Sequence, residues 1–125
     1  MTKTNKTKPS TVIHTIATFC VDHKAHDVKV YHFTHPLFEE ASVVTSVSNT
    51  THLRSLRDTL AKFCAEHYAK NRDEVMATGD VDSGWVLLTL AGEVGVHMML
   101  PATRTFYDLD GLFMQRGSVT IYSSI

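Results

Sequence analysis

Residues 85–101 read WVLLTLAGEVGVHMMLP, and this stretch decides the fold because it places two apolar runs on either side of a short connection. Residues 85–90 and 94–100 are apolar on both faces, a pattern typical of strands buried at the centre of a sheet. The connection at 91–93 contains Gly and is tight enough to make the two runs antiparallel neighbours. Pro101 ends the second run because it cannot donate a backbone hydrogen bond. The stretch therefore predicts a central antiparallel strand pair.

The sequence before this hairpin predicts two helices and two strands. Apolar residues recur at three- and four-residue spacing over 12–24, which indicates a helix. Residues 27–34 and 41–47 are rich in β-branched and aromatic side chains, as strands are. A second helix follows the potential capping residues at 48–51. The stripe along this helix comprises Leu53, Leu56, Leu60, Phe63, Cys64 and His67.

A short third strand is predicted around residues 74–78, before the hairpin, and a short helix after it. Thr103 opens this helix. Its residues expected to face inward are Phe106, Leu109, Leu112 and Phe113. Residues 114–125 could add an edge strand or stay loose. The expected fold class is α/β (α+β), a mixed sheet of about five strands flanked by helices.

The length of 125 residues leaves room for one domain. We expect a flexible tail rich in Lys and Thr at residues 1–10, a single domain at 11–113 and a C-terminal extension at 114–125. The 12 Lys and Arg residues are balanced by 13 Asp and Glu residues. This balance disfavours binding that depends on coating phosphates with positive charge, so no direct sequence-specific binding to nucleic acid is expected.

Cysteine usage and hydropathy bear on the compartment. Cys20 and Cys64 lie among apolar, helix-like residues, which suits buried thiols in a reducing environment. No run approaches the roughly 18 apolar residues of a membrane span, and the first residues lack the apolar core of a signal peptide. We therefore expect a cytoplasmic protein with no membrane association.

Eight histidines raise the question of a metal site. Cys20, His23 and His26 are separated by two residues each, and this spacing drifts around a helix instead of holding one face. Surface or partly buried histidines are the default, with a metal-dependent regulator as the alternative. No metal and no cofactor is expected. His97 lies in an apolar strand, where we favour a core imidazole hydrogen-bonded to backbone or carboxylate over a catalytic base.

Two Asp-x-Asp pairs, Asp80 with Asp82 and Asp108 with Asp110, contain ligands that Mg²⁺ accepts. Neither pair lies beside a phosphate-binding loop, and the sequence has no Walker loop or nucleophile elbow. The sequence therefore predicts a protein that is not an enzyme. The alternative is a nucleotidyltransferase-like, Mg²⁺-dependent enzyme that uses Asp80 and Asp82.

Residues 85–113 resemble the ribosomal silencing factor family, also called the RsfS or Iojap family. The shared features are the Trp-led apolar strand, the hairpin, Val96 with His97, Leu100 with Pro101, Arg104, and the run from Phe106 to Leu109 closed by Leu112 and Phe113. Weaker similarity extends back to about Val12. The chain is identified as a divergent member, since Thr89, for example, stands where relatives have an acid.

The resemblance implies a fold related to nucleotidyltransferases without their catalytic carboxylates. It also implies action by binding: relatives dock on protein fourteen of the large ribosomal subunit and block the small subunit sterically. That block represses translation, and some relatives assist assembly of the large subunit. The free protein could form a homodimer, because an exposed apolar docking face tends to self-associate.

Candidate partner-binding residues lie in the hairpin and in the turn after it. They are Trp85, Met98, Leu100, Pro101, Arg104, Phe106 and Tyr107. Pro101 and Arg104 are expected to be exposed at the turn from strand to helix. Trp85 and Phe106 could equally be core residues, and one of the methionines at 98–99 must point inward because strand residues alternate. With balanced charge, the docking energy is expected mainly from apolar and aromatic contacts.

Overall fold

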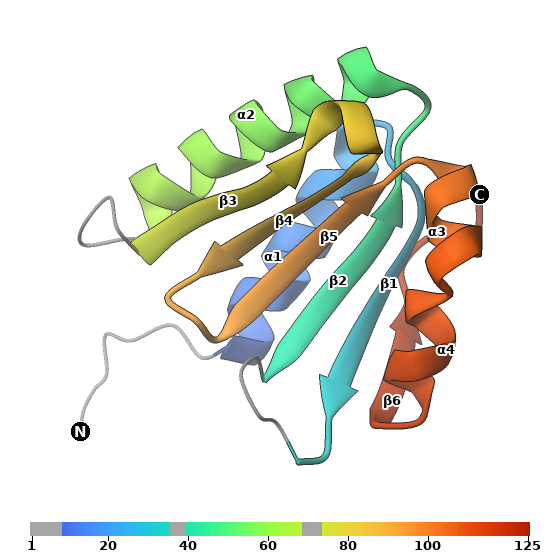
Figure 1. Ribbon diagram of the computed structural model, residues 1–125. Coiled ribbons are helices and arrows are strands. Elements are labelled where there is room, and N and C mark those ends of the chain that lie inside the picture. Colours follow the sequence, from blue (N-terminus) through green and yellow to red (C-terminus); the bar gives the residue numbers. More distant parts are fainter. Residues whose placement is uncertain (1–8, 36–39, 69–73) are drawn as a thin grey trace.

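The computed structural model describes residues 9–35, 40–68 and 74–125, which form a six-stranded sheet with helices on both faces (Figure 1). The elements in chain order are α1 (Pro9–Asp22), β1 (His26–Phe33), β2 (Ala41–Ser46), α2 (Thr50–His67), β3 (Val75–Asp80), η2 (Val81–Ser83), β4 (Trp85–Leu90), β5 (Val94–Met99), α3 (Pro101–Tyr107), α4 (Leu109–Met114) and β6 (Gly117–Ile121). The strand order is β3-β4-β5-β2-β1-β6. The β2–β5 pair is parallel and the other pairs are antiparallel, so the sheet is mixed as expected.

Local sequence explains where α2 and α3 begin. The side chain of Asn49 accepts a hydrogen bond from the backbone N–H of His52 at 2.8 Å, which satisfies a donor that the first turn of α2 leaves open. Pro101 opens α3, where its missing N–H costs nothing. The predicted hairpin is also present, because β4 and β5 pair from Trp85–Met99 to Leu90–Val94.

The larger core lies between the sheet and the helices α1 and α2. Strand residues such as Val30, Val43 and Val96 form one cluster there with buried residues of α1 and the buried stripe of α2. Cys20 and Cys64 are free, buried thiols of this core, and burial raises the pKa of each to about 12. The expectation of two buried thiols is confirmed.

A smaller core lies on the opposite face of the sheet, beneath α3 and α4. Its buried members are Tyr31, Val44, Met99, Leu109 and Phe113. Figure 1 shows these two helices toward the β1–β6 side of the sheet. The described part of the chain therefore leaves β3 and most of β4 uncovered on this face.

The structure differs from the expectations near the C-terminus. Residues 117–121 form the edge strand β6, which pairs with β1 and brings the sheet to six strands instead of about five. The single helix expected after Thr103 is two helices, because Asp108 adopts a left-handed backbone (φ 48°) that ends α3 and caps α4. Leu109 and Phe113 face inward as expected. The same expectation is wrong for Phe106 and Leu112, which are 79% and 50% exposed, because the break at Asp108 turns the two helices differently.

Residues 1–8 of the expected tail lie outside the described residues, and α1 already begins at Pro9. Within the described ranges, no helix has the length and apolar character required to cross a bilayer.

Candidate protein-binding site

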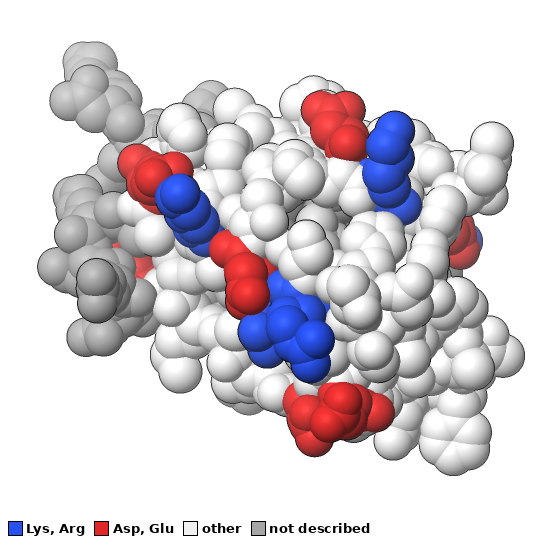
Figure 2. All heavy atoms as spheres, turned by 90° about the horizontal axis from the view of Figure 1, so that it is seen from above, with Lys and Arg blue, Asp and Glu red and all other residues white. Residues whose placement is uncertain are grey.

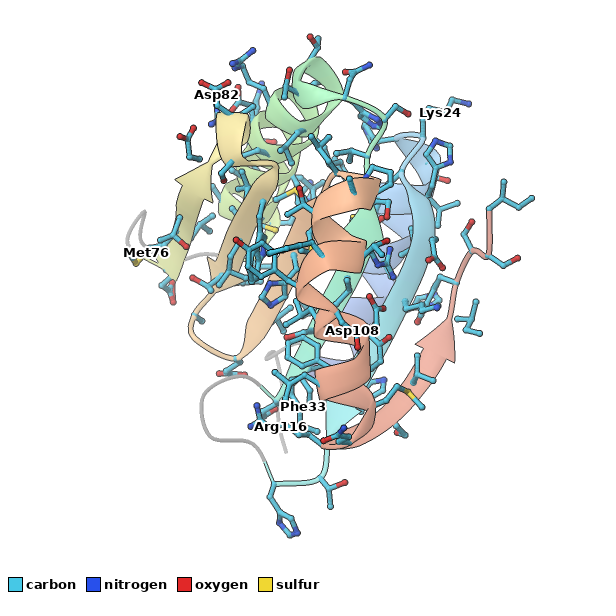
Figure 3. All side chains as sticks on the ribbon, turned by 45° about the vertical axis from the view of Figure 1, so that its right-hand side comes forward. Lys24, Phe33, Met76, Asp82, Asp108 and Arg116 are labelled. Carbon is cyan, nitrogen blue, oxygen red and sulfur yellow. The ribbon has the colours of Figure 1, made fainter. Side chains whose placement is uncertain are left out.

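The uncovered half of the sheet presents a mainly apolar surface. Trp85, Leu87 and Thr89 alternate along β4 toward this side, and all three are half-buried. Register pairing sets Thr78 of β3 opposite Leu87 and Met76 opposite Thr89, and directly paired residues share a face. Met76 is 55% exposed and stands on the outermost strand (Figure 3). We call these five residues the open sheet face.

Two aromatic residues of α3 extend this surface. Phe106 is 79% exposed and Tyr107 is 57% exposed, and their rings meet edge to face with centroids 4.9 Å apart. The Tyr107 ring also lies 5.1 Å from the ring of Trp85, so α3 joins the sheet at this point. We call the open sheet face together with Phe106 and Tyr107 the docking surface. Exposed aromatic groups next to an apolar sheet face are typical of protein-binding sites.

His97 on the neighbouring strand β5 contacts Trp85. The indole N–H of Trp85 donates a hydrogen bond to Nδ1 of His97 at 3.2 Å. The imidazole is 6% exposed and packs edge to face on Phe113 at 5.5 Å. The expectation of a buried, hydrogen-bonded imidazole is confirmed, but this partner is an indole and not a backbone group or a carboxylate. The pair fixes the orientation of the largest side chain of the docking surface.

Arg104 holds α3 on the sheet, and it is the buried residue of that helix. Its guanidinium donates to both carboxylate oxygens of Asp110, at 2.8 and 2.9 Å. It also donates to the carbonyl of Asp27 at 2.8 Å and to the Ser46 hydroxyl at 3.0 Å. Tyr31 completes the network by donating its hydroxyl to Asp110 at 2.6 Å. The helix that carries the exposed aromatics is therefore docked by a polar network.

The network also shifts the titration of its members. Burial alone would raise the pKa of Asp110, but the hydrogen bonds from Arg104 and Tyr31 lower it below the ordinary value. Burial alone would lower the pKa of Arg104, yet the hydrogen bond and charge of Asp110 raise it. Burial first, and then the hydrogen bond to Asp110, raise the pKa of Tyr31. At neutral pH the Arg104–Asp110 pair is thus held fully ionised.

The candidate partner-binding residues fall into two groups. Pro101, Phe106 and Tyr107 are exposed, and Trp85 and Leu100 are half-buried. Met98 and Arg104 are buried. Met98 is fully enclosed in the core under α1 and α2, because β5 is central and both of its faces are covered. The expectation that Arg104 is exposed is wrong, since its side chain turns inward to acidic and carbonyl oxygens from β1 and α4.

Sequence reasoning did not select Leu87, Thr78 or Met76 as surface residues. The alternation of β4 was available as a signal for Leu87, because it lies two residues after Trp85. What the pattern could not show is that no described helix covers this side of β3 and β4.

Three of the four aspartates considered for Mg²⁺ have structural roles, namely Asp80, Asp108 and Asp110. The Asp80 side chain accepts from the backbone N–H of Asp82 at 3.0 Å and caps the short helix η2. Asp108 caps α4 by accepting from Gly111 N–H at 3.2 Å, and Asp110 belongs to the Arg104 network. Cys20 is buried, whereas His23 is exposed and stacks on Phe19. Over residues 9–35, 40–68 and 74–125, no group of three or more His, Cys, Asp or Glu side chains is arranged to hold a metal ion.

The comparison with known families decides the relationship. The family model described as ribosomal silencing factor during starvation, RsfS, matches residues 5–124. The chain belongs to the ribosomal silencing factor family. The match covers almost the whole chain and therefore includes residues 114–124, which the sequence patterns alone had set apart as an extension. Membership in the RsfS family supports a general role as a ribosomal silencing factor in the regulation of translation.

Solved structures share the RsfS fold seen here. A crystal structure of a protein from Chromobacterium violaceum is similar with a TM-score of 0.71 and 22% identity, over 89% of this chain and 90% of that chain. A crystal structure of a protein from Bacillus halodurans is similar with a TM-score of 0.63 and 23% identity, over 81% of this chain and 92% of that chain. At 22% and 23% identity, this similarity shows a shared fold and nothing about function.

Proposed function

We propose that this protein binds the large ribosomal subunit through its protein fourteen, by means of the docking surface, and blocks subunit joining by steric exclusion. The observation that carries the proposal is the exposed pair Phe106 and Tyr107 beside the open sheet face. Family membership supports a ribosomal partner. Acting by binding requires no catalytic group, and of the two aspartates in the enzymatic alternative, Asp80 serves as the cap of η2.

The size of the domain suits a steric mechanism. A typical protein interface covers roughly 800 Å² on each partner. The total accessible surface of the described structure is 7172 Å², so one side of the sheet can supply such an area. A compact domain fixed at the face where two subunits meet excludes the second subunit by its volume.

The decisive experiment is sedimentation of purified protein with isolated large subunits, followed by a subunit-joining assay. Phe106→Ser with Tyr107→Ser removes two exposed aromatic groups. One interface hot spot costs about 2 kcal/mol or more, so the dissociation constant is expected to rise by roughly 30-fold even if only one of the two residues is a hot spot, and the block on joining to weaken in parallel. Both side chains are solvent-exposed, so the variant should keep the far-UV spectrum and urea midpoint of the wild type.

A matched control uses exposed apolar residues elsewhere. Met114→Ser with Ile121→Ser changes two side chains that are 50% and 59% exposed, at the end of α4 and on β6. This control is expected to bind large subunits as the wild type does. Equal loss in both double variants, or no loss in a folded Phe106→Ser, Tyr107→Ser protein, would contradict the proposed docking surface. Binding of large subunits without any effect on joining would instead support a role in subunit assembly.

We also propose that the protein acts in the cytoplasm and that the free protein dimerises through the same docking surface. Apolar surfaces that lack their partner tend to self-associate. Analytical ultracentrifugation tests the second point, since the Phe106→Ser, Tyr107→Ser variant is then expected to sediment as a monomer at concentrations where the wild type is dimeric.

A further inference from the structure

Charge is distributed unevenly along the chain, although the total is close to zero. Residues 74–113, from β3 to α4, contain six carboxylates and one residue of Lys or Arg type, Arg104, which gives a formal net charge of −5. The remaining residues hold the other 7 of 13 acids and the other 11 of 12 basic residues, which gives +4. The segment that forms the docking surface is thus strongly acidic. The near-zero net charge of the whole chain does not reveal this local excess of acidic residues.

Four of these acids surround the docking surface. Asp80 and Asp82 lie at the η2 end of β3 and β4, whereas Glu93 lies at the opposite end, in the β4–β5 connection. Asp108 follows Tyr107 at the end of α3. Figure 3 shows how Asp82 at one end of the strands, Met76 on the outer strand and Asp108 on the helices are spread around this side. We call Asp80, Asp82, Glu93 and Asp108 the acidic rim.

No Lys or Arg of the described residues pairs with the acidic rim. All four residues are exposed, and none forms an ion pair within the described residues. The hydrogen bonds that Asp80 and Asp108 accept come from backbone N–H groups, which carry no formal charge. Arg104 cannot compensate them from the surface, because it is 6% exposed and bonded to Asp110. Figure 2 looks from above onto α2 and the η2 end of the strands, and it shows charges of both signs interspersed there.

We propose that the docking surface selects a basic protein surface, in which an apolar centre contacts the aromatic groups and Lys or Arg side chains face the acidic rim. This inference rests on the proposed function and specifies the chemistry of its partner. An acidic rim repels RNA phosphates, which carry one charge per nucleotide, so on a particle rich in RNA it restricts docking to protein. Charge complementarity at a rim acts mainly on the rate of association and on its salt dependence.

The test compares two variants with the same change in net charge. Asp82→Lys with Glu93→Lys reverses the rim at both ends of the strands, and among the described residues only the backbone groups of these two residues form hydrogen bonds. Asp22→Lys with Glu66→Lys changes exposed residues of α1 and α2, on the other face of the sheet. The association rate with isolated large subunits is measured for both variants and for the wild type, at about 50 mM and about 500 mM salt, where screening differs strongly.

The rim variant is expected to associate about tenfold more slowly than the control at low salt, and the difference should shrink to about twofold at high salt. Equal rates for rim variant and control would overturn the inference while leaving the docking surface intact. Faster association of the rim variant would overturn it too, because the rim would then face RNA phosphates. If the wild type does not bind large subunits at all, the proposed function fails, and this inference fails with it.

Discussion

Replacing Arg104 tests how α3 is attached to the sheet. The substitution Arg104→Met keeps much of the aliphatic side chain and removes the guanidinium, which donates four hydrogen bonds to Asp110, Asp27 and Ser46. It leaves Asp110 partly buried without its cation, with the Tyr31 hydroxyl as its remaining side-chain donor. Since Arg104 is the buried residue of α3, the helix loses its main anchor.

The expected magnitude follows from the burial of this ion pair. Removing one partner of a buried pair costs about 3–5 kcal/mol, because the other charge is left uncompensated. The carboxylate of Asp110 retains 22% exposure, which places the expected loss of unfolding free energy near the lower bound, about 3 kcal/mol. A domain with a total stability of about 5–15 kcal/mol should survive this loss in folded form.

Urea unfolding followed by far-UV circular dichroism measures the loss, and fluorescence of the single Trp reports on α3 because Trp85 contacts Tyr107. A double-mutant cycle with Asp110→Leu separates the ion pair from packing. The double variant is expected to be more stable than the sum of the single losses predicts, by at least about 1 kcal/mol, since no uncompensated charge remains. A loss below about 1 kcal/mol in Arg104→Met, or strict additivity in the cycle, would refute the account of α3 given above.

Three further outcomes are expected. Burial raises the pKa of Cys20 and Cys64 to about 12, so neither thiol of the folded protein should react with a disulfide reagent at pH 8. Both should react once guanidinium unfolds the protein. Rapid reaction of the native protein would contradict their burial. The pKa of Asp110 is lower in the folded protein than its unfolded value of 3.8, so its ionisation stabilises the fold above that pH and this stability is lost as the pH falls toward the folded pKa. Asp110→Asn should therefore reduce the fall in unfolding free energy at acid pH. An unchanged fall would mean that other carboxylates cause it. Gly84 has φ +83°, and a Cβ there would lie 2.6 Å from Oγ1 of Thr103. Gly84→Ala should therefore lower the urea midpoint by an amount equivalent to about 1–3 kcal/mol. An unchanged midpoint would show that α3 moves away from this contact without cost.

Periodicity and turn chemistry predicted most elements of the fold. The hairpin at residues 85–100 could be predicted because both strands have apolar residues on both faces and the connection contains Gly92. The start of α2 was readable because Asn49 and its neighbours are local capping residues. These features depend on residues close in sequence, so a linear pattern records them. The resemblance in residues 85–113 likewise indicated the family before any geometry was known, and the family match over residues 5–124 agrees with it.

The location of the docking surface depended on contacts distant in sequence. Arg104 was expected outside because it follows a turn, but its carbonyl and hydroxyl partners, Asp27 and Ser46, lie 77 and 58 residues away. A local sequence pattern cannot show that these distant acceptors form a buried site for a guanidinium. Phe106 points outward for the same reason, because it follows the buried Arg104 by two residues and therefore lies on the opposite side of α3.

The sequence by itself determined the strands β1 to β5, the main helices, the buried thiols and the family. The tertiary structure alone decided which side of β4 remains uncovered and which carboxylates surround it. The physical reason is that secondary structure follows from steric and hydrogen-bonding preferences over a few residues. The exposure of a strand depends instead on which distant segments pack together and on which part of the sheet the helices cover.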